Sequence, residues 1–176
     1  PGPMDPVRAG LVELVRDIAA RRRPFLGVCL GHQALGLAFG ATLINSTPAH
    51  GKRALARFDD GRTREVMRYH SLSLTDVRAP LRVTARLDDG TVMAVRHETL
   101  PMTGVQFHPD SFGTPEGRAL LAELLSTPPL PLGGESRSES RNVFAPPVSE
   151  KLSQLTPLTD FALLAETDAL GDALVL

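Results

Sequence analysis

The sequence predicts an α/β fold: an open, mostly parallel sheet flanked by helices, with additional antiparallel hairpins. Helix-like and strand-like patterns alternate over residues 6–44, which is typical of a parallel sheet with helices on both faces. Two Asp-Asp-Gly triplets, at 59–61 and 88–90, each separate a pair of strand-like segments, and this arrangement indicates a hairpin. A proline-rich segment follows residue 126, where the composition of a packed domain ends.

The first elements are predicted from apolar spacing and from residues that begin or end helices. Asp5 is expected to cap a helix with Pro6 at its first position, and Pro24 ends that helix. Gly40 ends the next helix. The expected elements are a helix over 6–23, a buried strand over 25–28, a helix over 30–39 and a short strand over 41–44.

The second half of the domain is predicted to contain strands and a final helix. Thr114 is expected to cap this helix, which runs from Pro115 to about Leu125. The expected strands are 54–58, 63–69, 81–87, 91–97 and 103–107.

Composition and charge divide the chain into three parts. Residues 1–126 are expected to form one domain, 127–150 a linker, and 151–176 a tail or the start of a further segment. Residues 127–176 carry a net charge of −4 and the rest carries +3. The overall charge of −1 does not favour a nucleic-acid partner, and no apolar run is long enough to cross a membrane. The single cysteine excludes an intramolecular disulfide and favours the reducing cytoplasm.

That cysteine, Cys29, lies between an apolar strand and the start of a helix. A lone cysteine in a folded protein is more often a small buried apolar side chain than a nucleophile. Here Gly27 and Gly31 flank it in a thiol version of the nucleophile elbow, G-x-C-x-G. A sharp turn at this position exposes the side chain, and the positive end of the following helix favours the thiolate. The pattern therefore favours a nucleophile.

A partner for the thiol is expected at the end of another strand. His108 follows the segment 103–107, and in an α/β sheet the carboxyl ends of parallel strands meet at one edge. Asp110, two residues further on, is placed to orient the imidazole and stabilise its charged form. Cys29, His108 and Asp110 are therefore the expected catalytic group.

Four motifs in order resemble those of the class I, triad-type glutamine amidotransferases, and most closely the small subunits of anthranilate synthase and aminodeoxychorismate synthase. The resemblance covers about residues 1–126 and rests on Gly-Val-Cys-Leu-Gly-His-Gln at 27–33, His-Gly-Lys at 50–52, Arg-Tyr-His-Ser-Leu at 68–72 and Gly-Val-Gln-Phe-His-Pro-Asp at 104–110. It implies that Cys29 attacks the side-chain amide of glutamine to form a γ-glutamyl thioester, while His108, held by Asp110, transfers the protons. The glutaminase half would need no cofactor and no metal. Its ammonia would pass through a channel to a chorismate-using synthase, as a subunit or a fused domain.

The resemblance also implies which groups bind the substrate. The backbone N–H groups of Leu30 and Gly2 would form the oxyanion hole. The side chain of Gln33, together with Ser71 and Leu72, would bind the amino-acid end of glutamine.

Two departures from the family pattern leave alternatives open. The family usually has glutamate where this chain has Asp110, and its opening strand–helix units are absent here, so a missing N-terminal portion is expected. The first alternative is a non-catalytic interaction subunit of the same fold. The second is a γ-glutamyl hydrolase-like enzyme, against which the motifs at 50–52 and 68–72 argue.

Overall fold

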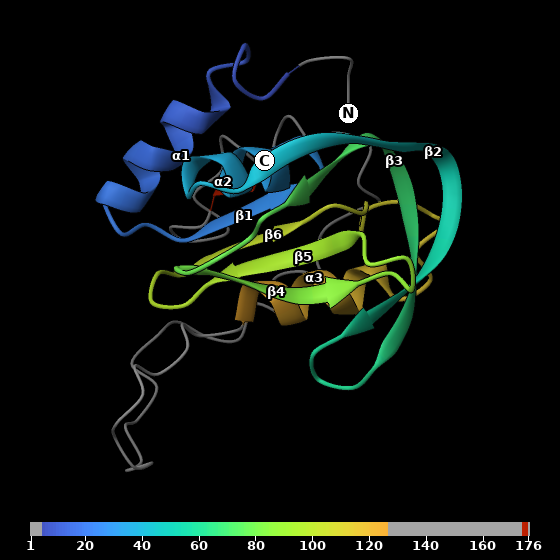
Figure 1. Ribbon diagram of the computed structural model, residues 1–176. Helices are drawn as coiled ribbons and strands as arrows, with labels where there is room; N and C mark the ends of the chain where they lie inside the picture. The colour runs from blue at the N-terminus through green and yellow to red at the C-terminus, as the bar shows by residue number, and fades with distance from the viewer. Residues whose placement is uncertain (1–4, 127–173, 176) are drawn as a thin grey trace.

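The computed structural model describes residues 5–126 and 174–175 (Figure 1). Seven strands form one sheet in the order β3-β2-β4-β5-β6-β1-β7. The expected linker at 127–150 and most of the expected tail at 151–176 lie outside the described residues. The exception is β7 (Leu174–Val175), which pairs in parallel with β1 at the edge of the sheet.

The first third of the described chain forms helix α1 (Leu11–Ala20), strand β1 (Phe25–Val28) and helix α2 (Leu30–Ala38). The alternation predicted for this part is confirmed. The first helix begins at Leu11, later than expected, because Asp5 accepts the N–H of Val7 at 2.8 Å and closes a separate turn. None of the helices in the described residues is long and apolar enough to cross a membrane.

The two predicted hairpins are confirmed. The first joins β2 (Thr42–Phe58) to β3 (Thr63–Thr75), and the second joins β4 (Leu81–Arg86) to β5 (Val92–His97). Residues 41–44 and 54–58 were expected as separate strands, but both belong to the long strand β2. This strand curves with β3 around one side of the molecule (Figure 1). Register shifts interrupt the β2–β3 pairing between Asn45 and Lys52, as bulges do where a strand bends.

The prediction of a mostly parallel sheet is wrong for the described part. Among the described strands, β1 pairs in parallel with β6 (Met102–Val105) and with β7. The other four pairs of neighbouring strands are antiparallel. The physical reason is the connection between strands. Parallel neighbours need a crossover of about a dozen residues or more, usually a helix, and short turns join β2 to β3 and β4 to β5.

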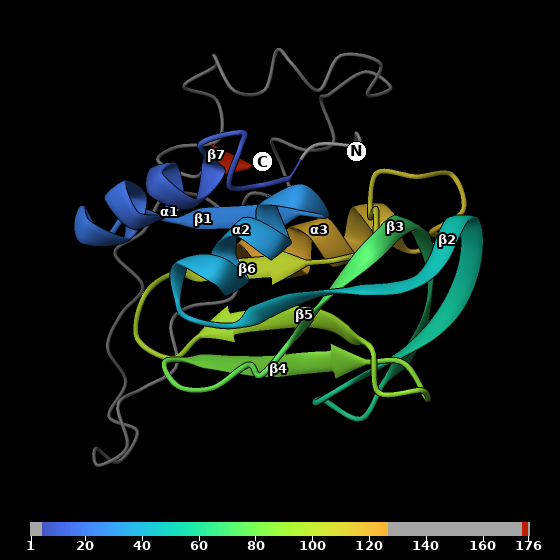
Figure 2. The ribbon, with the colours of Figure 1, turned by 45° about the horizontal axis from the view of Figure 1, so that its top comes forward.

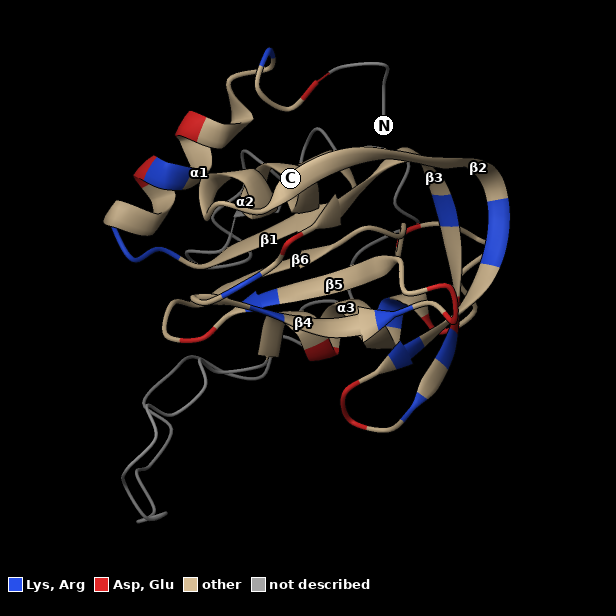
Figure 3. Cartoon of the chain, viewed as in Figure 1, with Lys and Arg blue, Asp and Glu red and all other residues tan. Residues whose placement is uncertain are grey.

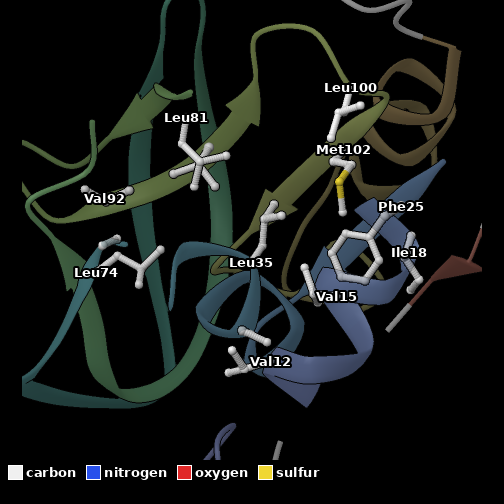
Figure 4. Close-up of a cluster of buried hydrophobic side chains, with 13 residues drawn as sticks. Val12, Val15, Ile18, Phe25, Leu35, Leu74, Leu81, Val92, Leu100 and Met102 are labelled. Atoms are coloured by element: carbon white, nitrogen blue, oxygen red, sulfur yellow. The ribbon is translucent and has the colours of Figure 1, made fainter. Parts of the chain in front are cut away.

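Each face of the sheet has its own apolar core. Helices α1 and α2 lie on one face, and α3 (Gly117–Ser126) lies on the other (Figures 1 and 2). On the first face, Val12, Val15 and Ile18 of α1 pack with Phe25 and Leu35 (Figure 4). The apolar residues of α1 recur every three positions along the helix, so they lie on one face and pack α1 against α2 and β1.

Candidate active site

Cys29 lies at a sharp turn between β1 and α2. Its φ of 52° and ψ of −97° are unusual for a residue with a side chain, and such strain costs on the order of 1–3 kcal/mol. The turn is held on both sides: the N–H of Cys29 donates to Val105 O at 2.8 Å, and its carbonyl accepts the N–H of Gln33 at 3.1 Å. The structure thus contains the strand–turn–helix elbow predicted from the sequence.

The glycines of the elbow allow two backbones to approach closely. A Cβ atom on Gly27 would lie 2.5 Å from the carbonyl carbon of Gly31 and 2.8 Å from the nitrogen of His32. Gly104, which pairs with Gly27 across β1 and β6, would bring a Cβ to 3.1 Å from Cα of His32. At Gly27 the structural requirement is close packing of α2 on the sheet.

His108 and Asp110 lie beside Cys29. The Nδ1 atom of His108 is 3.4 Å from Oδ1 of Asp110, which is longer than an ordinary hydrogen bond. Burial lowers the pKa of His108, but Asp110 and Cys29 outweigh this effect and raise it to about 9. The interaction with His108 lowers the pKa of Asp110. The charged imidazolium is therefore the favoured form of His108 at neutral pH.

The backbone of His108 is fixed by β3 and by the loop that follows. Its N–H donates to Met67 O at 2.9 Å, and its carbonyl accepts the hydroxyl of Thr114 at 2.7 Å. The Thr114 hydroxyl also accepts the N–H of Met67 at 3.0 Å, so this side chain holds the His108 loop instead of capping the last helix as predicted. The Tyr69 ring packs edge-on against the His108 ring, with 5.2 Å between the ring centroids.

A cleft of about 1190 Å³ opens beside Cys29. Five of the residues predicted from the sequence line it together: Cys29, Leu30, Gln33, Ser71 and Leu72. His108 and Asp110 are not among the residues that line it, but His108 interacts with Cys29, which does. Gly2, the other predicted oxyanion donor, lies outside the described residues. The thiol, although only 6% exposed, therefore faces an open space large enough for an amino acid.

The side chain of Gln33 is used inside the protein as well as at the cleft. Its Nε2 atom donates to Leu72 O at 3.3 Å and to Oε1 of Gln106 at 3.2 Å. Both amide hydrogens are thereby used, which leaves Oε1 of Gln33 as its acceptor. Sequence analysis gave no role to Gln106, whose Nε2 atom donates to the Cys29 sulfur at 3.7 Å. The only signal in the sequence was its place in the motif 104–110.

His32, two residues after Leu30 on α2, is fully buried, and neither ring nitrogen has a hydrogen-bond partner among the described residues. Burial lowers its pKa to about 4, although the Gly104 backbone opposes this shift. The ring is therefore neutral in the folded protein.

The buried His32 should make the fold sensitive to acid. Because the pKa is lower in the folded state than in the unfolded state, the stabilisation is complete above pH 6.5 and is lost as the pH falls toward 4. The loss amounts to at most about 3 kcal/mol. We expect His32→Leu to reduce the loss of unfolding free energy between pH 7 and pH 4.5, as measured by urea denaturation. Curves for the two proteins that stay parallel over this range would contradict the prediction.

Several Lys and Arg residues occur along β2 and β3 (Figure 3). Lys52, which belongs to the motif at 50–52, and the next residue, Arg53, are both exposed on β2. No group of three or more His, Cys, Asp or Glu side chains with the geometry of a metal site occurs in residues 5–126.

Comparison with known proteins assigns the family. A family model described as glutamine amidotransferase class-I matches residues 1–127. The chain belongs to the class I glutamine amidotransferase family. A solved glutamine amido transferase from Methylobacillus flagellatus has the same fold, with a TM-score of 0.55 at 22% identity over 70% of this chain and 51% of that one.

Two curated relatives of this amidotransferase domain are named as a synthase and as a synthase component. It is 47% identical over 131 residues to an aminodeoxychorismate synthase of Streptomyces griseus, covering 69% of this chain and 18% of that protein. It is 46% identical over 139 residues to anthranilate synthase component 2 of Mycobacterium tuberculosis, covering 72% of this chain and 59% of that protein. The chain thus spans well under two thirds of the length of these relatives.

Proposed function

We propose that this amidotransferase domain hydrolyses glutamine to glutamate and ammonia at Cys29 and delivers the ammonia to a chorismate-using synthase. The observation that carries the proposal is the arrangement around the thiol. Cys29 lies at a strained elbow beside the His108–Asp110 pair and opens onto a cleft. The similarity to anthranilate synthase component 2 and aminodeoxychorismate synthase supports the choice of synthase.

The chemistry follows from the protonation state of His108. The Cys29 thiolate attacks the side-chain amide carbon of glutamine, and the N–H of Leu30, the first residue of α2, donates to the oxyanion. The His108 imidazolium gives its proton to the leaving nitrogen, so ammonia departs and a γ-glutamyl thioester remains. His108 then takes a proton from water, which attacks the thioester and releases glutamate. The sulfur leaves as the thiolate, so the thiolate–imidazolium pair is restored, and no redox step is needed.

Substrate binding is assigned to the cleft. The amide oxygen of Gln33 is a suitable acceptor for the α-ammonium group of glutamine, and Ser71 and Leu72 of β3 line the same cleft. Lys52 and Arg53 of β2 are basic and exposed, which suits an interface with the synthase. The free thiol suits a cytoplasmic location.

The decisive experiment measures glutamate release from glutamine by the full-length protein together with its synthase. We expect release that depends on Cys29 and a synthase that works without this protein when ammonium is supplied. The same assay, run separately with the partner component of an anthranilate synthase and with that of an aminodeoxychorismate synthase, distinguishes the products. Full release by Cys29→Ala, or no release by the wild type, would overturn the proposal. No release by the wild type would favour a non-catalytic subunit. Release that no synthase influences would favour a γ-glutamyl hydrolase-like enzyme.

Lengthening the acid beside His108 provides a milder test. Asp110→Glu is expected to preserve or raise kcat, because an extra methylene can close the 3.4 Å separation between carboxylate and imidazole. Asp110→Asn, the matched control, removes the charge and should lower kcat about a hundredfold or more. Steady-state glutamate release measures both. A fall of tenfold or more in Asp110→Glu would mean that the loop is built around the shorter acid.

A further inference from the structure

The sulfur of Cys29 has a second neighbour that the chemistry above does not use. Gln106 follows strand β6 directly and is completely buried. Its Nε2 atom lies 3.7 Å from the Cys29 sulfur, a normal distance for an N–H donor to this large acceptor atom. His108 and Gln106 thus both contact the nucleophile from the same short segment.

The orientation of the Gln106 amide is fixed by its neighbours. The carbonyl of Leu72 can only accept, so it requires the nitrogen of Gln33, which lies 3.3 Å away. The second hydrogen on that nitrogen then points to Gln106, whose oxygen must face it, at 3.2 Å. The nitrogen of Gln106 is left to face the sulfur. An amide flip at Gln106 would place its nitrogen against the Gln33 nitrogen and its oxygen against the Cys29 sulfur, so both hydrogen bonds would be lost.

The Leu72 carbonyl also interacts with a second side chain, that of His70, within β3. Nδ1 of His70 lies 2.9 Å from Leu72 O, and Arg68 Nε donates to Nε2 of His70 at 3.1 Å. Accepting from Arg68 requires an unprotonated Nε2, so Nδ1 carries the proton and donates it to the carbonyl. Burial, followed by the Arg68 charge, lowers the pKa of His70 to about 4 and keeps this neutral form. The donor and the acceptor are therefore assigned in each hydrogen bond of the series that joins Arg68, through His70, Leu72, Gln33 and Gln106, to the Cys29 sulfur.

We propose that Gln106 is a positioning residue that directs an amide N–H at the Cys29 sulfur and so stabilises the thiolate. The inference rests on the proposed function, because it concerns the same nucleophile. A hydrogen bond to a charged acceptor is stronger than one between neutral groups, and more so where water is excluded. Gln106 and Gln33 are 0% and 3% exposed, so water does not compete for this amide.

Alkylation of the thiol by iodoacetamide tests the proposal without any substrate. Cys29 is the single cysteine of the 176-residue chain, so the labelled site is unambiguous. Gln106→Leu keeps a similar volume and removes the donor, and Gln106→Asn keeps an amide but withdraws it by one methylene. In both variants we expect the pH of half-maximal alkylation to rise by about one unit, which is a tenfold loss of rate on the rising limb. His108, His70 and His32 are unchanged, so the shift reports on residue 106.

The matched control is Phe107→Leu. Phe107 is equally buried and adjacent, but it packs in the apolar core under α3 and offers the sulfur no hydrogen bond. It should lower the unfolding temperature without moving the alkylation profile. The proposal would be overturned if Gln106→Leu and Gln106→Asn fold and alkylate with the same pH dependence as the wild type. A shift of the same size in Phe107→Leu would also overturn it. So would failure of both Gln106 variants to fold, since the role would then be structural.

Glutaminase kinetics add a readout that separates this inference from the proposed function. In the complex with its synthase, Gln106→Asn should lower kcat about tenfold with little change in KM, since Gln106 does not line the cleft. If the wild type releases no glutamate, the proposed function fails, yet the alkylation profiles still decide whether Gln106 holds the thiolate. A change confined to KM would contradict a role at the sulfur.

Discussion

Replacing His108 with asparagine is expected to lower kcat for glutamine hydrolysis by about a thousandfold. Asparagine is smaller than histidine and can still hydrogen bond, but it can neither carry a proton to the leaving nitrogen nor take one from water. General acid–base catalysis by a positioned side chain contributes about 10²–10⁴ in rate. Because burial, Asp110 and Cys29 together set the pKa of His108 at about 9, the lost group is the imidazolium that pairs with the thiolate.

The measurement is glutamate release under single-turnover and steady-state conditions with the synthase present. The ammonium-dependent activity of the synthase is the internal control and should stay unchanged, because it does not use this site. Alkylation of Cys29 at neutral pH should also slow, since the thiolate loses its counter-charge. Turnover within tenfold of the wild type would show that His108 is not the proton carrier.

A large loss of stability is expected for Gly27→Ala. The added methyl group would lie 2.5 Å from the carbonyl carbon of Gly31 and 2.6 Å from its oxygen, and these are backbone atoms that no rotamer change can move. Helix α2 would have to shift away from β1, together with the elbow that holds Cys29. We expect a loss of about 3 kcal/mol or more in the free energy of unfolding, at or above the upper range for overpacking.

Gly113→Ala is the matched control in denaturant unfolding. There the new methyl group meets the side chain of Met67, whose terminal methyl can swing aside. The loss should stay below about 1.5 kcal/mol. Equal losses in the two variants would contradict the argument that the approach of α2 to β1 requires glycine at position 27.

Much of the fold could be predicted from local patterns. The elbow at Cys29 and the two Asp-Asp-Gly hairpins follow from glycines and from turn chemistry that act within a few residues. The direction of the remaining strands could not be predicted in this way. The helix–strand alternation of the first 44 residues predicted a mostly parallel sheet to which the hairpins at 59–61 and 88–90 are additions, whereas most neighbouring strands in the described sheet are antiparallel. Polar residues between Asn45 and Lys52 hid the continuity of β2, because its pairing with β3 shifts register there.

In the candidate site, too, some residues could be predicted from local patterns and others could not. The motif patterns named the thiol, imidazole and carboxylate, and the structure brings these groups together. Gln106 was missed because its place in the motif 104–110 does not reveal which residues its side chain contacts. Its partners, Cys29 and Gln33, are 77 and 73 positions away in the chain.

By itself, the sequence determined the local geometry of the nucleophile: a strand, a strained turn and a helix, set by glycines and apolar spacing. Only the tertiary structure decided what surrounds the sulfur. Val28 pairs with Val105 in the parallel β1–β6 register, so the residues that follow each strand, Cys29 on one side and Gln106 and His108 on the other, emerge at one edge. Register depends on contacts summed over the whole sheet and on the packing of α2 against Gly27 and Gly104, and a short-range pattern does not contain these contacts.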